Sequence, residues 1–205
     1  MNFIKGEYEH IRTFYREEFG KTLKMTAVAF VALLVIGFVG GLVFPDLATG
    51  FVERFTAQVQ ESGIIESDGS VHVAALLANN IRASFYTLIY GLLPFIYLPA
   101  LALGLNAMLL GAMAAFYVHE GLSLAYFFVG ILPHGVFELP ALVVSIALGL
   151  YLCGKINQRL QQKVKGIVFS AINNAMHMML FVSLPLLLIA SFVEAYITPL
   201  LLKLF

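Results

Sequence analysis

Two side chains that can bind protons or metal ions lie four residues apart in an apolar stretch. His134 and Glu138 belong to the block PHGVFELP at 133–140, and on a helix this spacing places both side chains on one face. One interpretation is a hydrogen-bonded pair that fixes helix packing. Another is two ligands of a divalent metal site, such as a zinc site, with Glu194 or His119 as the third. The third is a pair that transfers protons. The zinc protease signature HExxH is absent.

Further polar residues fall within or beside apolar segments: Asn79, Asn80, Arg82, Asn106 and Glu194. An ionisable group at membrane depth costs at least a few kcal/mol and therefore needs a partner or a purpose. Arg82 would either extend to the outer interface beside a helix cap or form an ion pair with Glu138 or Glu194. Asn106 would cap a turn or bond across helices. We predict that the polar groups form one intramembrane cluster around His134.

The composition indicates whether water or lipid surrounds these polar residues. Of the 205 residues 60% are hydrophobic and only 12% are charged, whereas ordinary soluble proteins are about 25% charged. The sequence therefore predicts an all-α, polytopic transmembrane helical bundle in the lipid bilayer of the cell membrane. The formal net charge is +0, which does not favour nucleic-acid binding. The single cysteine, Cys153, excludes a disulfide within the chain.

Apolar runs of sufficient length predict about five membrane spans. They cover residues 25–44, about 80–100, 105–118, 121–152 and 167–189. Gly104 and Asn106 are expected to form the turn between the second and third spans. Pro133 gives two alternatives for the fourth: a single kinked span, or a short helix at 122–131 followed by a span from 133 to 152. The second is favoured, because proline is well tolerated in the first turn of a helix.

The basic residues predict the orientation. Residues 1–24 and 153–165 hold nine of the twelve Lys and Arg, and such segments stay in the cytoplasm. Residues 1–24 are then a cytoplasmic amphipathic helix, and residues 25–205 are one transmembrane domain. The acidic loop 45–78, with a short amphipathic helix, is expected to be extracytoplasmic. The N-terminus lies inside and the C-terminus outside.

Several of these blocks together resemble the stage II sporulation protein M family. The matching residues are NNIR at 79–82, Gly91, GLN at 104–106, Gly111, LPHG at 132–135, ELPA at 138–141, Gly149, Glu194 and TP at 198–199. The resemblance covers about residues 25–200 and implies a five-span, all-helical protein. The namesake is a membrane component of the engulfment machinery of endospore formers. It is thought to act as a scaffold with stage II sporulation proteins D and P, which process peptidoglycan.

The resemblance therefore implies a scaffold that is not an enzyme and that recruits or positions cell-wall remodelling proteins. Two alternatives remain: a dimeric transporter or channel with a polar intramembrane site, and an intramembrane metal-binding protein that uses His134, Glu138 and Glu194. No cofactor is expected for a scaffold, a transporter or a channel. The metal-binding protein would hold a divalent cation such as zinc. Glycines at 37, 40, 41, 104 and 111 permit close helix approach within the chain or in a homodimer.

Overall fold

The computed structural model describes residues 2–65, 71–163 and 166–204. Its described part is helical, with one isolated bridge between Ile65 and Val71, so the all-α prediction is confirmed. The helices are α1 (Asn2–Phe14), α2 (Gly20–Val43), α3 (Pro45–Glu61), α4 (Val73–Gly91), α5 (Leu98–His119), α6 (Leu124–Gln162), α7 (Ile167–Met178), α8 (Leu184–Phe192) and α9 (Thr198–Leu202). Three π-helical turns join some of them: η1 (Tyr15–Phe19), η2 (Met179–Ser183) and η3 (Val193–Ile197).

Four continuous helical segments of the described chain are long and apolar enough to cross a membrane. They run over Ile4–Val43, Leu98–His119, Leu124–Gln162 and Ile167–Leu202. The first combines α1, η1 and α2, and the last combines α7, α8 and α9 with the two turns between them. A count of five spans stays a prediction, in which α4 supplies the additional crossing. The predicted orientation also remains to be tested.

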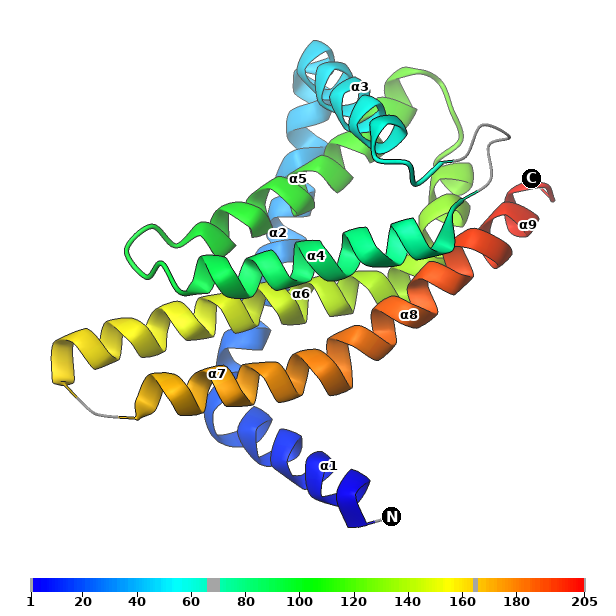
Figure 1. The fold of residues 1–205 in the computed structure, drawn as a ribbon. Coiled ribbons are helices and arrows are strands. Elements are labelled where there is room, and N and C mark those ends of the chain that lie inside the picture. The colour runs from blue at the N-terminus through cyan, green and yellow to red at the C-terminus, as the bar shows by residue number, and fades with distance from the viewer. Residues whose placement is uncertain (1, 66–70, 164–165, 205) are drawn as a thin grey trace.

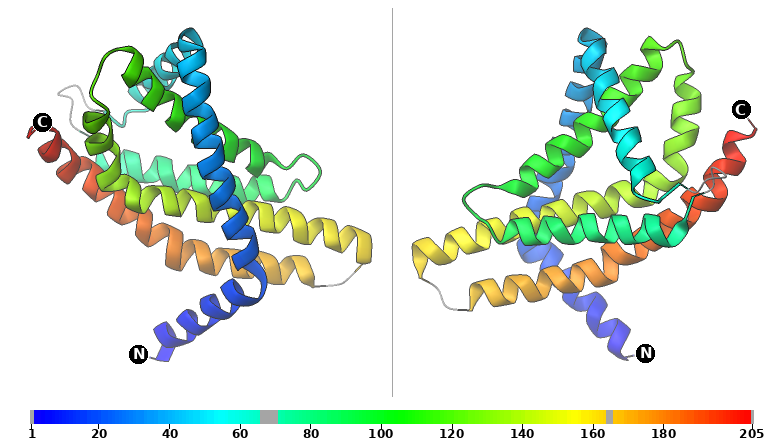
Figure 2. Two further views of the ribbon diagram at one scale, coloured as in Figure 1. Left: turned by 180° about the vertical axis from the view of Figure 1, so that it is seen from behind. Right: turned by 45° about the horizontal axis from the view of Figure 1, so that its top comes forward.

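Helix α6 forms the centre of the molecule (Figure 1) and packs against α2, α4, α5 and the α7–α9 segment. Its buried residues include Ile146 and Leu148, both with 0% of their surface exposed. Helix α2 crosses α6 and packs along α5 (Figure 2). This arrangement places the first half of α6 beside the end of the chain, because α6 contacts both η3 and α9.

Glycine permits close approach at two helix crossings. A side chain at Gly111 of α5 would meet the backbone oxygen of Leu34 in α2 at 2.1 Å. A side chain at Gly149 of α6 would meet the backbone oxygen of Thr87 in α4 at 2.3 Å. Gly111 is one of the glycines predicted to permit close approach, and it does so within the chain. Gly40 and Gly104 differ, because a Cβ atom added there meets nothing within 4 Å.

The turn predicted at Gly104 and Asn106 is wrong. Helix α5 continues through both residues, and the chain reverses at 92–97, where Tyr97 has a left-handed φ of 48°. Pro99 lies in the first turn of α5, where its missing N–H costs nothing. Pro99 thus marks the start of α5, and Gly104 lies inside the helix.

The helix break predicted at Pro133 is also wrong. Helix α6 includes both Pro133 and Pro140 without interruption, and its first turns run at an angle to the rest (Figure 2). Each proline removes one helical hydrogen bond and bends the helix. The single kinked segment is therefore the correct alternative.

The described residues of the predicted N-terminal segment 1–24 and the first half of the predicted loop 45–78 are helical. The N-terminal segment folds back on α6 and α7, where Tyr151 donates a hydrogen bond of 2.8 Å to Glu18 and His177 lies 2.6 Å from Glu7. Lys155 forms an ion pair with the same Glu18 carboxylate. Helix α3 occupies the first half of the predicted loop 45–78, and residues 66–70 of that loop lie outside the described residues. The side of the membrane on which each segment lies stays a prediction.

Candidate functional site

His134, Glu138 and Glu194 lie together where the bent part of α6 meets η3. One possible ligand atom from each residue lies within 4.8 Å of the other two, and all three residues are partly buried. The Nε2 atom of His134 is 4.0 Å from an oxygen of Glu138, with 14% and 30% of the two side chains exposed. It is the one group of three or more such residues found in the described ranges. The structure therefore brings together the three residues predicted as metal ligands.

Thr198 of α9 holds the other side of the His134 ring. Its hydroxyl oxygen lies 3.3 Å from Nδ1 of His134, and only 5% of its surface is exposed. A partner at Nδ1 fixes the ring and directs Nε2 to the opposite side, where Glu138 lies. Glu194 and Thr198 are four residues apart, as are His134 and Glu138, so one helical face on each side forms the site.

Glu194 lies within a π-helical turn. Such turns are rare and are frequent at functional sites. Three residues before it, Ser191 is 1% exposed, and its hydroxyl has no hydrogen-bond partner among the described residues. Buried hydroxyl groups are normally paired, so this segment departs from ordinary helix packing next to the site.

One imidazole and two carboxylates form a ligand set suited to zinc and similar divalent cations. Two ligand atoms that are each about 2.0–2.1 Å from a tetrahedral zinc ion lie about 3.3 Å apart. The 4.0 Å between His134 and Glu138 exceeds this spacing by less than the movement that side-chain rotation provides. Three protein ligands would leave a fourth position open for a further group.

The family model described as Stage II sporulation protein M matches residues 25–199. The chain belongs to this family. A second comparison finds that it is 31% identical over 163 residues to Uncharacterized protein MJ0793 of Methanocaldococcus jannaschii, covering 73% of this chain and 88% of that protein. No solved structure matches. All four site residues lie within the segment that matches the family model, and the long apolar helices agree with a membrane protein of this family.

In this stage II sporulation protein M family member, the polar residues of α4 and α5 do not join the site as predicted. Arg82 donates a 3.3 Å hydrogen bond to Asn79 of its own helix, and no ion pair joins it to Glu138 or Glu194 in the described chain. Asn106 donates to the Ala102 oxygen one turn earlier, at 2.8 Å. The amide nitrogen of Asn80 is buried without a partner among the described residues. His119, the alternative third ligand, is exposed at the end of α5.

A second polar group inside this family member was missed from the sequence. Thr87 donates to the Ser145 backbone oxygen at 2.9 Å. The Ser145 hydroxyl, which donates to Ala141 of its own helix at 2.7 Å, lies 3.3 Å from the Ser183 hydroxyl and can accept from it. These bonds tie α4, α6 and η2 together in the core. Serine and threonine are too common in membrane helices for spacing alone to identify such contacts, although all three residues are small enough for close packing.

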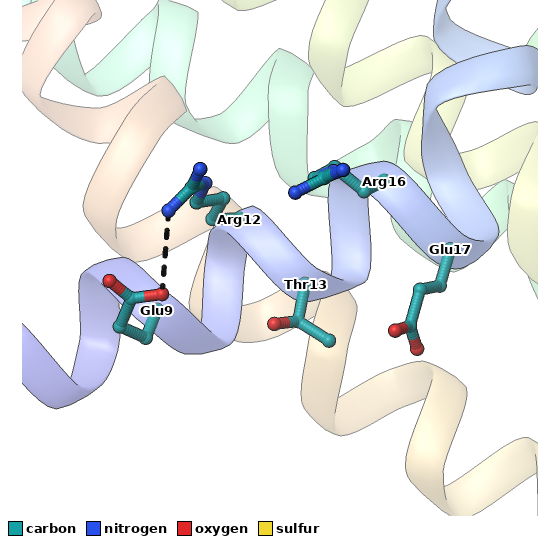
Figure 3. A pocket seen from close by; sticks show the side chains of 5 residues that line it. All are labelled: Glu9, Arg12, Thr13, Arg16 and Glu17. Carbon is teal, nitrogen blue, oxygen red and sulfur yellow. Dashed lines mark ion pairs between the residues drawn. The ribbon is translucent and has the colours of Figure 1, made fainter.

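A charged surface along α1 and η1 forms a further hollow of the family member (Figure 3), lined by Glu9, Arg12, Thr13, Arg16 and Glu17. Arg12 and Glu9 are 3.8 Å apart, with 52% and 55% of their side chains exposed. An exposed pair of this kind contributes little energy. The surface is therefore the polar face of an amphipathic helix and not a second site.

Proposed function

We propose that this protein is a non-enzymatic membrane scaffold in which a divalent cation, such as zinc, joins α6 to the end of the chain. The observation that carries the proposal is the convergence of His134, Glu138 and Glu194 within 4.8 Å. A cation held there would connect the bent half of α6 to η3 and keep the two segments in one arrangement.

The geometry favours a cation over the two other interpretations of the pair. The Nε2 atom of His134 and the nearest Glu138 oxygen are 4.0 Å apart, so the two groups form no hydrogen bond in this structure and the ring nitrogen is open to a cation. Two carboxylates in one partly buried site repel each other when both are charged. A divalent cation offsets this repulsion and can take an oxygen ligand from each carboxylate together with the imidazole nitrogen.

The proposed role of the cation is structural and not catalytic. Many metal hydrolases use a general base in addition to the metal ligands. Here all members of the cluster would bind the cation, and in the described part of the chain no further His, Cys, Asp or Glu belongs to the group. We therefore propose that the bound cation supports structure.

The scaffold role in the cell membrane rests on the family to which the chain belongs. We propose that the protein recruits or positions peptidoglycan-remodelling proteins comparable to stage II sporulation proteins D and P, and that it acts as a homodimer. Helix α3 exposes Glu53 and Gln60, which supports a polar interaction surface outside the bundle. Cross-linking in native membranes, followed by identification of captured proteins, tests this role. Recovery of the chain without any wall-processing partner would argue against it.

The cation role is tested by thermal unfolding of the purified full chain with zinc and after chelation. Zinc at 100 times its dissociation constant would stabilise the fold by about 2.7 kcal/mol, which raises Tm by about 5–10 °C. The response should disappear in His134→Ala. It should persist in His72→Ala, where the lost histidine caps α4 far from the cluster in sequence. An equal response in wild type and His134→Ala would refute the cation role.

A further inference from the structure

An apolar groove runs between α2, α3 and α5, apart from the candidate cation site. Its volume is about 410 Å³, which lies within the range of about 300–1,000 Å³ found for ligand pockets. Aromatic and aliphatic side chains form much of its walls, among them Phe44, Phe55, Leu105 and Met108. It is therefore shaped for an apolar ligand and not for a polar metabolite.

Glycine creates the floor of the groove. Gly37, Gly40 and Gly41 of α2 all line it. Gly37 and Gly41 also face α5 closely, since a Cβ atom would meet Met108 at 2.4 Å and Ala115 at 2.7 Å. Gly40 has nothing within 4 Å of such an atom. Its missing side chain is thus not needed for helix packing but leaves the groove open.

Helix α3 covers the groove with one face. The lining residues of α3 recur at helical spacing: Leu47, Ala48, Phe51, Arg54, Phe55 and Gln58. Arg54 is the one charged residue among those that line the groove, and its side chain is exposed. It makes no ion pair or hydrogen bond with another described residue, and it is the one Lys or Arg of residues 45–78. The groove therefore combines an apolar floor with an unpaired cation at its wall.

We propose that this groove binds one glycerophospholipid of the bilayer, with an acyl chain on the glycine floor and the phosphate at Arg54. Apolar cavities exclude water, and lipid is the apolar phase around a membrane-spanning chain. A guanidinium group binds phosphate through paired, charge-assisted hydrogen bonds. The amide of Gln58, one turn along α3, can donate to the same headgroup. This lipid site is independent of the proposed cation.

The first test compares two lipids that differ only in the phosphate headgroup. The full chain in neutral detergent, stripped of lipid, is mixed with dioleoyl phosphatidylglycerol or with dioleoylglycerol, and bound lipid is counted by native mass spectrometry. We expect one tightly held phosphatidylglycerol and about 10-fold weaker binding of the neutral lipid. Arg54→Gln should lower phosphatidylglycerol binding by about 10-fold, while Arg159→Gln, at the far end of α6, should leave it unchanged. If the wild type binds both lipids equally well, and Arg54→Gln binds them as the wild type does, the phosphate contact is overturned.

The second test fills the floor of the groove. Gly40→Leu should lower phosphatidylglycerol binding by at least about 10-fold, because its side chain occupies the space of the acyl chain. Gly104→Leu is the matched control, since Gly104 is also an open helical glycine but does not line the groove. Unchanged binding in Gly40→Leu would overturn the proposal. The proposal would also be overturned if Gly40→Leu lost its dimers while its lipid binding stayed unchanged. A second copy of the chain would then occupy the groove. Because the Arg54 side chain is exposed, Arg54→Gln should fold. It therefore tests the phosphate contact even if Gly40→Leu does not fold.

Discussion

Thr198 fixes the ring that would bind the cation. Its hydroxyl lies 3.3 Å from Nδ1 of His134, so in the cation-bound protein Nδ1–H would donate to the threonine oxygen and Nε2 would face the metal. Partners of this kind set the tautomer and orientation of a ligating histidine. The site is therefore built from four side chains, of which three would touch the cation.

Removing this hydroxyl should weaken the site without removing a ligand. We expect Thr198→Val to lower zinc affinity by about 10–100-fold, the usual effect of losing the partner of a ligating histidine. The measurement is a zinc titration against a coloured chelator. Thr56→Val is the control, because the Thr56 hydroxyl donates to its own helix at Val52. An affinity in Thr198→Val equal to that of wild type would show that Thr198 does not orient the ring.

At the scale of single residues, the sequence predicts the three possible cation ligands but not Thr198, which contacts the His134 ring. The spacing of His134 and Glu138 determines their common helical face, and an acid at Glu194 inside an apolar segment calls for a partner. Thr198 carries no charge, and a threonine in a helix usually bonds to its own backbone. For Arg82 the sequence left two alternatives, a position at the outer interface beside a helix cap and an ion pair with Glu138 or Glu194. In the structure it donates to Asn79 one turn away.

The helices approach most closely where glycine removes a side chain, and this gives a prediction about stability. Gly149→Ala would press a methyl group against the Thr87 oxygen and Pro99 of neighbouring helices, and such overpacking costs about 1–3 kcal/mol. Gly104→Ala should instead stabilise α5 by about 0.5–1 kcal/mol, because alanine is the better helix former and the site is open. Thermal unfolding of both variants in detergent measures the difference. A gain in Tm for Gly149→Ala would show that α4 and α6 are not packed this closely.

At the scale of elements the apolar runs predict the helices well and their ends less well. A glycine–asparagine pair caused one error and a proline caused the other. The sequence suggested breaks at Gly104 with Asn106 and at Pro133, whereas the reversal occurs at 92–97 and α6 only bends. Local propensity cannot decide such cases, because a proline inside a helical pattern can either end the helix or only bend it.

The orientation of the whole molecule depends on whether α4 crosses the membrane. Helices α4, α5 and α6 separate Thr56 from Gln161. With α5 and α6 both crossing, as their length and composition allow, the two residues lie on opposite sides only if α4 also crosses. In a Cys153→Ala background, we expect an impermeant thiol reagent to label Thr56→Cys in intact cells and Gln161→Cys only after permeabilisation. Both residues are exposed. Labelling of both from the same side would reduce the number of spans and contradict the five-span topology.

The central claim is that His134, Glu138 and Glu194 hold one divalent cation. The most direct measurement is the metal content of the purified chain together with the zinc-edge X-ray absorption spectrum of the zinc-loaded protein. We predict one zinc per chain, with nitrogen and oxygen ligands at about 2.0–2.2 Å that include one imidazole. Loss of the imidazole signal and of zinc in His134→Ala, but not in His72→Ala, would complete the assignment. Zinc that is absent from the loaded wild type, or that is bound without an imidazole, would contradict it.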